Sequence, residues 1–282
     1  MIVLSDALGF CGGVRRAVNL AKELVCSSDG TVYSDGELVH NKFVLNRLKN
    51  VGLKIFEDKI PKNVTNKDVV LTRAHGTSDA RRAMLSEMFN TVIDGTCPHV
   101  SNMISNIKKH VDNGTFIIIA GNINHPEISA LTNDISPEKF AVVKSMEDIE
   151  VLQINSKNIL FMAQSTFNEL EFKNLSNKVK KLFPHAEIFD SICKSSKIRQ
   201  ISVYNLKDNG AQAIIVVGDH SSNNTKSLVK ASEKLNLPTF HVESVDDLHK
   251  YNLKTFHTVG VVSGTSTGQE EIDDVVAFLK SL

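Results

Sequence analysis

The strongest constraint on the fold is an internal repeat of strand-and-helix elements, about 95 residues long. Three kinds of segment recur at that spacing: a strand that ends in glycine, a serine-led acidic turn, and a strand that leads to cysteine. The pairs are residues 118–121 with 216–218, 145–148 with 244–247, and 92–97 with 188–193. Residues 2–11 form a longer version of the last kind, so three such units fill the chain of 282 residues.

Within each unit, short β-branched runs alternate with longer stretches of helical period, which is typical of parallel α/β proteins. Val14 and Val18 share one helical face, as do Val100 and Ile104, and Gly114 and Gly210 stand where helices should stop. The predicted strands are residues 2–4, 31–33, 69–71, 92–93, 116–120, 141–143, 159–162, 187–189, 213–217, 239–242 and 259–262.

We therefore expect three similar α/β lobes with small, mainly parallel sheets, arranged as a pseudo-threefold trefoil. The expected lobes are residues 1–97, 98–193 and 194–282. The N-terminal strand and Cys11 are in a position to complete the third lobe instead of the first, because residues 2–11 resemble the last element of a unit.

Three of the four cysteines lie where a predicted strand meets a predicted helix: Cys11, Cys97 and Cys193. A helix N-terminus stabilises a thiolate, and the C-terminal ends of parallel strands are where ligands bind. Three thiolates without a fourth indicate an iron–sulfur cluster with one open iron, or a zinc site completed by histidine or water. The alternative is three small buried apolar side chains. Cys26, at the end of a helix, is assigned to packing.

Histidine, hydroxyl and amide side chains gather at the other predicted strand ends, where helix N-termini can bind phosphate without Lys or Arg. Ser221-Ser222-Asn223 is the best such cradle, because three polar residues follow a strand and open a helix. Glu127 can pass protons to a bound substrate if burial raises its pKa. The same junctions contain His40, His75, His125, Ser165 and Ser266. Together they suggest reduction of a small phosphorylated molecule at a metal cluster.

Two of the strand-end hydroxyls also fit an ordinary structural role. Thr166 with Glu169, and Ser266 with Gln269, have the spacing of a capping box, in which the hydroxyl begins a helix. On this interpretation the helices would start directly after these two residues.

Composition excludes several classes of protein. Thirty-two basic residues balance thirty-two acidic ones, which leaves no basic footprint for nucleic acid. The absence of Trp and the presence of only three Tyr argue against stacking platforms for single strands. The longest apolar runs are about five residues, far below the roughly 18 of a membrane helix. No signal peptide is visible, so we expect a cytoplasmic protein with no membrane partner.

As a set, these motifs resemble the 4-hydroxy-3-methylbut-2-enyl diphosphate reductases, which perform the last step of the non-mevalonate isoprenoid pathway. The resemblance extends over the whole chain in the right order, and it is specific as a set although each motif alone is not. It rests on Gly9-Phe10-Cys11-Gly12-Gly13, Ala74-His75-Gly76, Asp94-Gly95-Thr96-Cys97-Pro98, His125-Pro126-Glu127, Gln164-Ser165-Thr166, Cys193 with Arg199-Gln200, and Ser221-Ser222-Asn223.

The resemblance implies a [4Fe–4S] cluster at the centre of the trefoil, with Cys11, Cys97 and Cys193 as ligands and one iron not ligated by protein. It implies that this iron binds the allylic hydroxyl, that Glu127 supplies protons with His125 nearby, and that Ser165 contacts the hydroxyl end. Reduced ferredoxin or flavodoxin would supply two electrons, and the products would be isopentenyl and dimethylallyl diphosphate. The implied diphosphate ligands are His40, His75, Ser221, Ser222, Asn223 and Ser266.

The chain departs from the usual family pattern at several positions. Gly95 stands where Ala is common, Ser165 where Thr is usual, and Thr267 where Pro is common. Residues 128–132 replace a stretch that tends to contain glycine, and Ser195-Ser196 replaces Ala-Thr. These changes leave room for a paralogue acting on a related diphosphate. The three-cysteine pattern also fits an iron–sulfur lyase of the quinolinate synthase type, or a non-catalytic zinc-binding scaffold.

Overall fold

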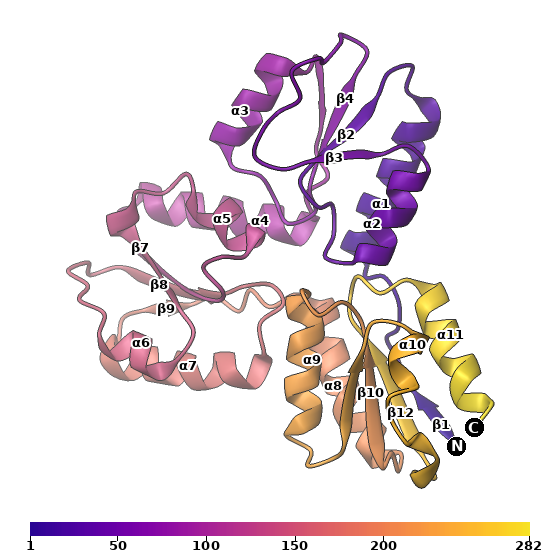
Figure 1. Ribbon diagram of the computed structural model, residues 1–282. Coiled ribbons are helices and arrows are strands. Elements are labelled where there is room, and N and C mark those ends of the chain that lie inside the picture. The colour runs from indigo at the N-terminus through magenta and orange to yellow at the C-terminus, as the bar shows by residue number, and fades with distance from the viewer. The chain divides into compact units, whose positions relative to one another are not determined.

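The computed structural model describes residues 1–282 and divides them into two compact units. The terminal unit combines Met1–Arg15, Val39–Leu48 and Lys194–Leu282, and the central unit combines Arg16–Leu38 with Lys49–Cys193. The terminal unit contains one sheet and the central unit contains two (Figure 1). Helices α1 (Gly12–Ser27) and α2 (Lys42–Asn50) each contain residues of both units.

All three sheets have four parallel strands in the same topological order. The first strand along the chain lies between the second and the third, and the fourth pairs with the third at the edge. In the terminal unit the fourth strand comes from the opposite end of the chain, because β1 pairs with β12 through Ile2–Val259 and Leu4–Val261. The three orders are β3-β2-β4-β5, β7-β6-β8-β9 and β11-β10-β12-β1.

The sheet of the terminal unit has helices on both faces. Helices α8 and α9 bury Val203 and Leu228 against one face, and α10 and α11 bury Leu248 and Val275 against the other. Its elements are β1 (Ile2–Leu4), α8 (Lys194–Asp208), β10 (Ala213–Val217), α9 (Asn223–Glu233), β11 (Thr239–Val242), α10 (Val245–Leu248), a 3-10 turn (Leu253–Thr255), β12 (Val259–Ser263) and α11 (Gln269–Lys280).

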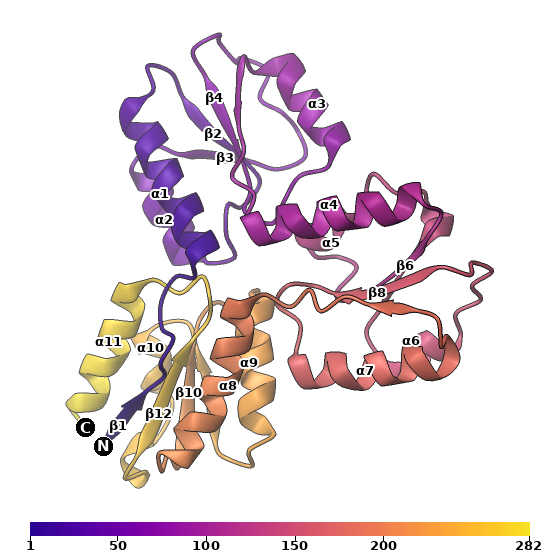
Figure 2. The same ribbon diagram turned by 180° about the vertical axis from the view of Figure 1, so that it is seen from behind.

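In the central unit, the first sheet packs against α3 through Leu85 and Phe89, which contact the aromatic rings of Tyr33 and Phe56. In both views α1 runs alongside this sheet (Figures 1 and 2). The elements are β2 (Val32–Asp35), β3 (Lys54–Phe56), β4 (Val69–Thr72), α3 (Asp79–Met88) and β5 (Thr91–Ile93).

The second sheet of the central unit is covered on both faces. Helices α4 and α5 contribute Met103 and Leu131 to one core, and α6 and α7 contribute Ile149 and Phe172 to the other. The elements are α4 (Pro98–Asp112), β6 (Phe116–Ala120), α5 (Pro126–Thr132), a 3-10 turn (Pro137–Lys139), β7 (Phe140–Val143), α6 (Met146–Glu150), β8 (Ile159–Ala163), α7 (Glu169–Leu182) and β9 (Glu187–Ile188).

The structure confirms the predicted fold class of three small parallel α/β sheets. Every predicted strand is present, and Gly114 and Gly210 follow the ends of α4 and α8 with φ of 72° and 85°. The one strand missed is β3, an edge strand whose three residues Lys54–Phe56 lack a β-branched run. The predicted lobe limits at 97 and 193 stay a prediction.

Three predictions on individual residues were wrong. Cys26 is exposed in the last turn of α1 and does not pack into a core. Helix α7 is capped by Asn168, whose side chain accepts from the amide of Glu171, and not by Thr166. Helix α11 begins after Gly268, so Ser266 is not its cap. In the last two cases the chain runs two more residues before the helix begins, a shift that a spacing rule cannot detect.

None of the helices is both long enough and apolar enough to cross a lipid bilayer.

A buried carboxylate joins the starts of two strands in the first sheet of the central unit. Asp68 accepts hydrogen bonds from the amides of Thr31 and Thr65, each 2.7 Å long, and the bond from Thr65 lowers its pKa. We predict that Asp68→Ala lowers the free energy of unfolding by about 2–3 kcal/mol at neutral pH, because two partly buried amides lose a charged partner. Urea unfolding of the variant and the parent measures this difference.

The lowered pKa of Asp68 determines how the stabilisation by this carboxylate changes with pH. The stabilisation is complete above the unfolded-state pKa near 3.8 and is lost as the pH falls through the lower folded-state value. The difference between parent and Asp68→Ala should therefore shrink below pH 3.8. A difference that stays constant down to about pH 2 would contradict this assignment.

Candidate functional site

Each of the three predicted cysteine ligands occupies the same topological position. Cys11 follows β1, Cys97 follows β5 and Cys193 follows β9, which are the fourth strands of the three sheets, and a helix begins at the next residue. In each case the cysteine amide donates to the carbonyl of the loop after the third strand of its own sheet. The acceptors are Thr265 at 3.0 Å, Ala74 at 3.0 Å and Ser165 at 2.9 Å, respectively.

The thiols have the surroundings of metal ligands. All three are partly buried, whereas Cys26 is exposed. Cys97 is the N-cap of α4, and the Cys11 sulfur accepts a 3.4 Å hydrogen bond from the amide of Val14 in the first turn of α1. Positive helix ends and amide donors stabilise thiolates, the form that binds iron or zinc. The donor set therefore fits a thiolate-bound metal centre.

The local backbone also explains why position 95, two residues before Cys97, is a glycine. The amide of Gly95 donates to the Thr72 hydroxyl at 3.1 Å, and a Cβ added to Gly95 would lie 2.0 Å from the Thr72 carbonyl oxygen. Alanine at position 95 does not fit this backbone without a shift of β4.

A buried glutamate and a buried serine form a hydrogen-bonded pair in the central unit. Glu127, in the first turn of α5, is 2% exposed. One of its carboxylate oxygens accepts from the Ser165 amide and the other accepts from the Ser165 hydroxyl, both at 2.6 Å. The Ser165 carbonyl accepts from the amide of Cys193, so the proposed acid, the hydroxyl and a thiol lie within one hydrogen-bonded chain of residues.

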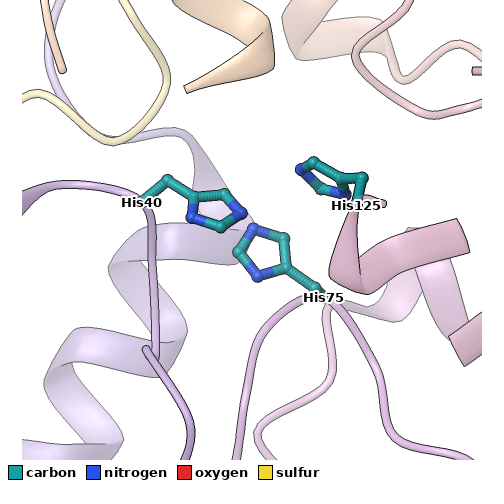
Figure 3. Close-up of side chains that lie close together, drawn as sticks. All are labelled: His40, His75 and His125. Carbon is teal, nitrogen blue, oxygen red and sulfur yellow. The ribbon is translucent and has the colours of Figure 1, made fainter. Parts of the chain in front are cut away.

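Two histidines of the central unit lie ring to ring beside this pair. His75 and His125 meet edge-on with their ring centroids 5.3 Å apart (Figure 3). The Nδ1 atom of His125 accepts from the amide of Glu127 at 3.0 Å, which leaves Nε2 to carry the proton. His125 is thereby a donor at Nε2 suited to an anionic ligand. His40, also drawn in Figure 3, belongs to the terminal unit.

Gly76 allows the His75 loop to approach the helices of the second sheet. Its φ is 93°, a conformation that favours glycine, and an added Cβ would lie 3.0 Å from the Cβ of Ala130 and 3.3 Å from Val100. A larger residue would push the loop, and the imidazole it carries, away from α5.

In the terminal unit the predicted phosphate cradle lies at the start of α9. Ser222 is its N-cap and accepts from the amide of Thr225, and Asn223 is the first helical residue. The first turn of α9 contains no acidic residue, so no side chain of the helix itself neutralises its positive end. Ser266 contacts His40, which is also predicted to bind substrate and belongs to the same unit. The Ser266 hydroxyl donates to the carbonyl of His40 at 2.8 Å.

Sequence reasoning missed Asp219, which connects the cradle to the segment that carries His40. One oxygen accepts from the amide and hydroxyl of Ser221, at 2.7 and 2.6 Å, and the other accepts from the amide of Lys42 at 3.0 Å. Burial acts to raise the pKa of Asp219, but the hydrogen bonds from Ser221 and Lys42 outweigh it and lower the pKa. The only signal in the sequence is an acidic residue directly after Gly218.

Asn224 was also missed, because two adjacent asparagines do not reveal which one points inward. Its side-chain oxygen accepts from the amide of Thr265 at 2.9 Å, and its side-chain nitrogen donates to the Ser196 hydroxyl at 3.2 Å. Asn224 is fully buried, whereas Asn223 is only partly buried. It therefore fixes the loop that accepts the Cys11 amide.

Three equivalent α/β sheets, each presenting one thiol and polar strand-end side chains, define a metal-binding enzyme of the α/β class. The family model described as LytB protein matches residues 2–280, and the chain belongs to this family. Membership implies an iron–sulfur cluster, and thiols are the donors that such clusters require.

Similar proteins of known name agree over the whole chain. A "4-hydroxy-3-methylbut-2-enyl diphosphate reductase" of Opitutus terrae is 33% identical and covers 100% of this chain and 99% of its own. A protein of the same name from Clostridioides difficile is 32% identical over 100% of this chain and 99% of its own. The solved reductase of Plasmodium falciparum has a TM-score of 0.92 at 28% identity, covering 99% of this chain and 88% of its own.

The Asp219 contacts generate a local prediction. We expect Asp219→Asn to speed hydrogen exchange at the amides of Lys42 and Ser221 by about tenfold, since a neutral amide is a weaker acceptor. Asp247→Asn is the matched control, because Asp247 accepts from the amide of Glu243 in the same unit. Unchanged exchange at both amides in Asp219→Asn, measured by NMR or mass spectrometry, would contradict the anchoring role.

Proposed function

We propose that this chain is a 4-hydroxy-3-methylbut-2-enyl diphosphate reductase. It removes the allylic hydroxyl of its substrate as water and yields isopentenyl and dimethylallyl diphosphate. The observation that carries the proposal is the full-length similarity to reductases of that name, at 33% and 32% identity. None of the positions implied as a metal ligand or proton donor is lost in this sequence.

We infer a [4Fe–4S] cluster held by Cys11, Cys97 and Cys193, with one iron free of protein ligands. The equivalent topological positions of the three cysteines and the shared hydrogen bond at each amide support this ligand set. When bound, such a cluster supplies single electrons and a Lewis-acidic iron. The rest of the reaction falls to the chain's own residues.

The diphosphate binds, in this proposal, to His40, His75, Ser221, Ser222, Asn223 and Ser266. Support comes from the type and placement of these donors: the first turn of α9 has no acidic residue, and the helix begins with a buried serine and an asparagine. Helix N-termini with hydroxyl and amide donors bind phosphate groups well. His125 adds a donor at Nε2, because its Nδ1 accepts from Glu127.

Ser165 and Glu127 deliver a proton to the departing hydroxyl. When Glu127 is protonated, the hydrogen bond between its carboxyl and the Ser165 hydroxyl reverses direction, so Glu127 donates to Ser165. The serine proton then points to the substrate hydroxyl, and one proton moves along the pair. Burial of both residues keeps bulk water away from the pair.

The reaction balances with two electrons and two protons. One proton leaves with the hydroxyl as water, the other adds to the carbon skeleton, and the carbon–oxygen bond breaks. A small ferredoxin or flavodoxin supplies the electrons, and we place the enzyme in the cytoplasm with no nucleic-acid or membrane partner.

Loss of one thiol should remove the cluster without unfolding the chain. Cys97→Ser is expected to be soluble, to lack absorbance near ~400 nm and bound iron, and to show no turnover, because a serine hydroxyl is a poor ligand for iron–sulfur clusters. Cys26→Ser, the exposed cysteine, is the matched control and should keep all three properties. Full iron content in Cys97→Ser would remove Cys97 from the ligand set.

Glu127→Gln tests the proton path. We expect turnover with reduced viologen to fall by about 100-fold while the cluster and the KM for substrate stay close to the parent values, since only a proton donor is lost. Glu150→Gln, an exposed residue paired with Lys178, is the control. Turnover near the parent value in Glu127→Gln would place the proton donor elsewhere.

A further inference from the structure

Helix α8 exposes apolar side chains where a surface helix would ordinarily be polar. Ile201 is 52% exposed, and Ile198 and Tyr204, three residues away on either side, are each 40% exposed. The opposite face of the helix buries Val203 and Leu206 in the core of the terminal unit. The three exposed residues therefore form a stripe along the outward side of α8.

The segment that ends at Cys11 runs along the same helix. The Ser5 hydroxyl lies 2.7 Å from that of Ser202, and the guanidinium of Arg199 donates to the carbonyl of Gly9 at 2.6 Å. Leu4, in the edge strand β1, is 47% exposed just before this segment but belongs to the other face of the sheet, because Val3 packs with the α8 core and Ile2 with the α10–α11 core. Figure 2 shows α8 alongside the sheet that ends in β1. We call Ile198, Ile201 and Tyr204 the α8 patch.

Two basic residues follow the cysteines that border α8 and the segment beside it. The Arg15 guanidinium donates to the carbonyl of Phe10, next to the Gly9 that contacts Arg199 of α8. Lys194 opens α8 directly after Cys193, and Arg15 lies in the first turn of α1 after Cys11. Both are exposed, and no ion pair joins either to a carboxylate. The acidic residues near the patch lie toward the C-terminal end of α8. Asp6 accepts a hydrogen bond from the side chain of Asn205, and Asp208 is the last residue of the helix.

We propose that the α8 patch, with Arg15 and Lys194, is the docking surface for a small acidic protein that carries single electrons. An apolar centre with a charged rim is the usual anatomy of a protein interface, and electron-transfer encounters use small ones. The basic rim complements an acidic carrier. The surface is continuous with the two backbone segments that bear Cys11 and Cys193, so a carrier bound there lies next to the chain that holds the cluster.

This inference rests on the proposed function and adds the place where its electrons enter. Each docking event oxidises the carrier by one electron and reduces the enzyme by one. Two events therefore supply the pair needed for one turnover, and the protons come from the Glu127 path. Small dyes such as viologen need no docking surface, so the two kinds of donor separate docking from chemistry.

The test compares two reductants on the reconstituted holoenzyme: reduced ferredoxin and reduced methyl viologen. Ile201→Glu places a negative charge in the α8 patch, and Leu170→Glu on α7 is the matched control, because Leu170 is also exposed on a helix. We expect Ile201→Glu to lower kcat/KM for ferredoxin by about tenfold or more. Viologen-driven turnover should stay within about twofold of the parent value. Tyr204→Glu serves as an independent second variant.

Charge is tested separately with Lys194→Glu, for which Lys181→Glu on α7 is the control. The ferredoxin-driven rate of the parent should fall as salt rises, and Lys194→Glu should flatten that dependence, because a rim charge acts mainly on the association rate.

The outcomes distinguish the two proposals. No viologen-driven turnover by the parent overturns the proposed function. If the parent turns over with viologen but Ile201→Glu and Tyr204→Glu both keep the parent rate with ferredoxin, the docking proposal is wrong and the proposed function stands. An equal loss with both reductants, or an equal loss in Leu170→Glu, also overturns it, because the effect would then not depend on contact with the carrier.

Discussion

The site depends on one repeated backbone constraint: the pairing of a short fourth strand with the third strand of its sheet. This pairing ends at a cysteine whose amide donates to the loop after the third strand, at Thr265, Ala74 or Ser165. The same loops carry Ser266, His75 and the Ser165 hydroxyl. One hydrogen bond in each sheet therefore fixes a thiol relative to a polar side chain, and in the terminal unit it requires β1 to pair with β12.

Much of this arrangement could be predicted from the sequence, because repeats and strand periodicity are local signals. The shared position of Cys11, Cys97 and Cys193 followed from the repeat, and the structure places each after a fourth strand. The short edge strand β3 was missed because three residues without a β-branched run give no pattern. Asp219 and Asn224 were missed because their roles depend on amides distant in sequence, at Lys42 and Thr265. The predicted helix caps at Thr166 and Ser266 were wrong because residue spacing alone does not determine where a helix begins.

The departures from the usual family pattern have local explanations at two positions. Gly95 is required by the close approach of the Thr72 carbonyl oxygen. Ser165 keeps the hydroxyl that meets Glu127 at 2.6 Å, so the loss of a methyl group relative to threonine leaves the hydrogen bond to the acid in place. Neither change removes a residue that we propose as a metal ligand or proton donor, which favours the family reaction over a paralogous one.

An anaerobic assay of the reconstituted protein with reduced viologen and hydroxymethylbutenyl diphosphate tests directly whether this chain is an iron–sulfur reductase of that substrate. Iron and sulfide are quantified on the same sample, and the products are separated by chromatography. We predict about four irons and four sulfides per chain, with both isopentenyl and dimethylallyl diphosphate formed. A cluster-loaded protein that forms neither product, or a protein that binds zinc in place of iron, would contradict it.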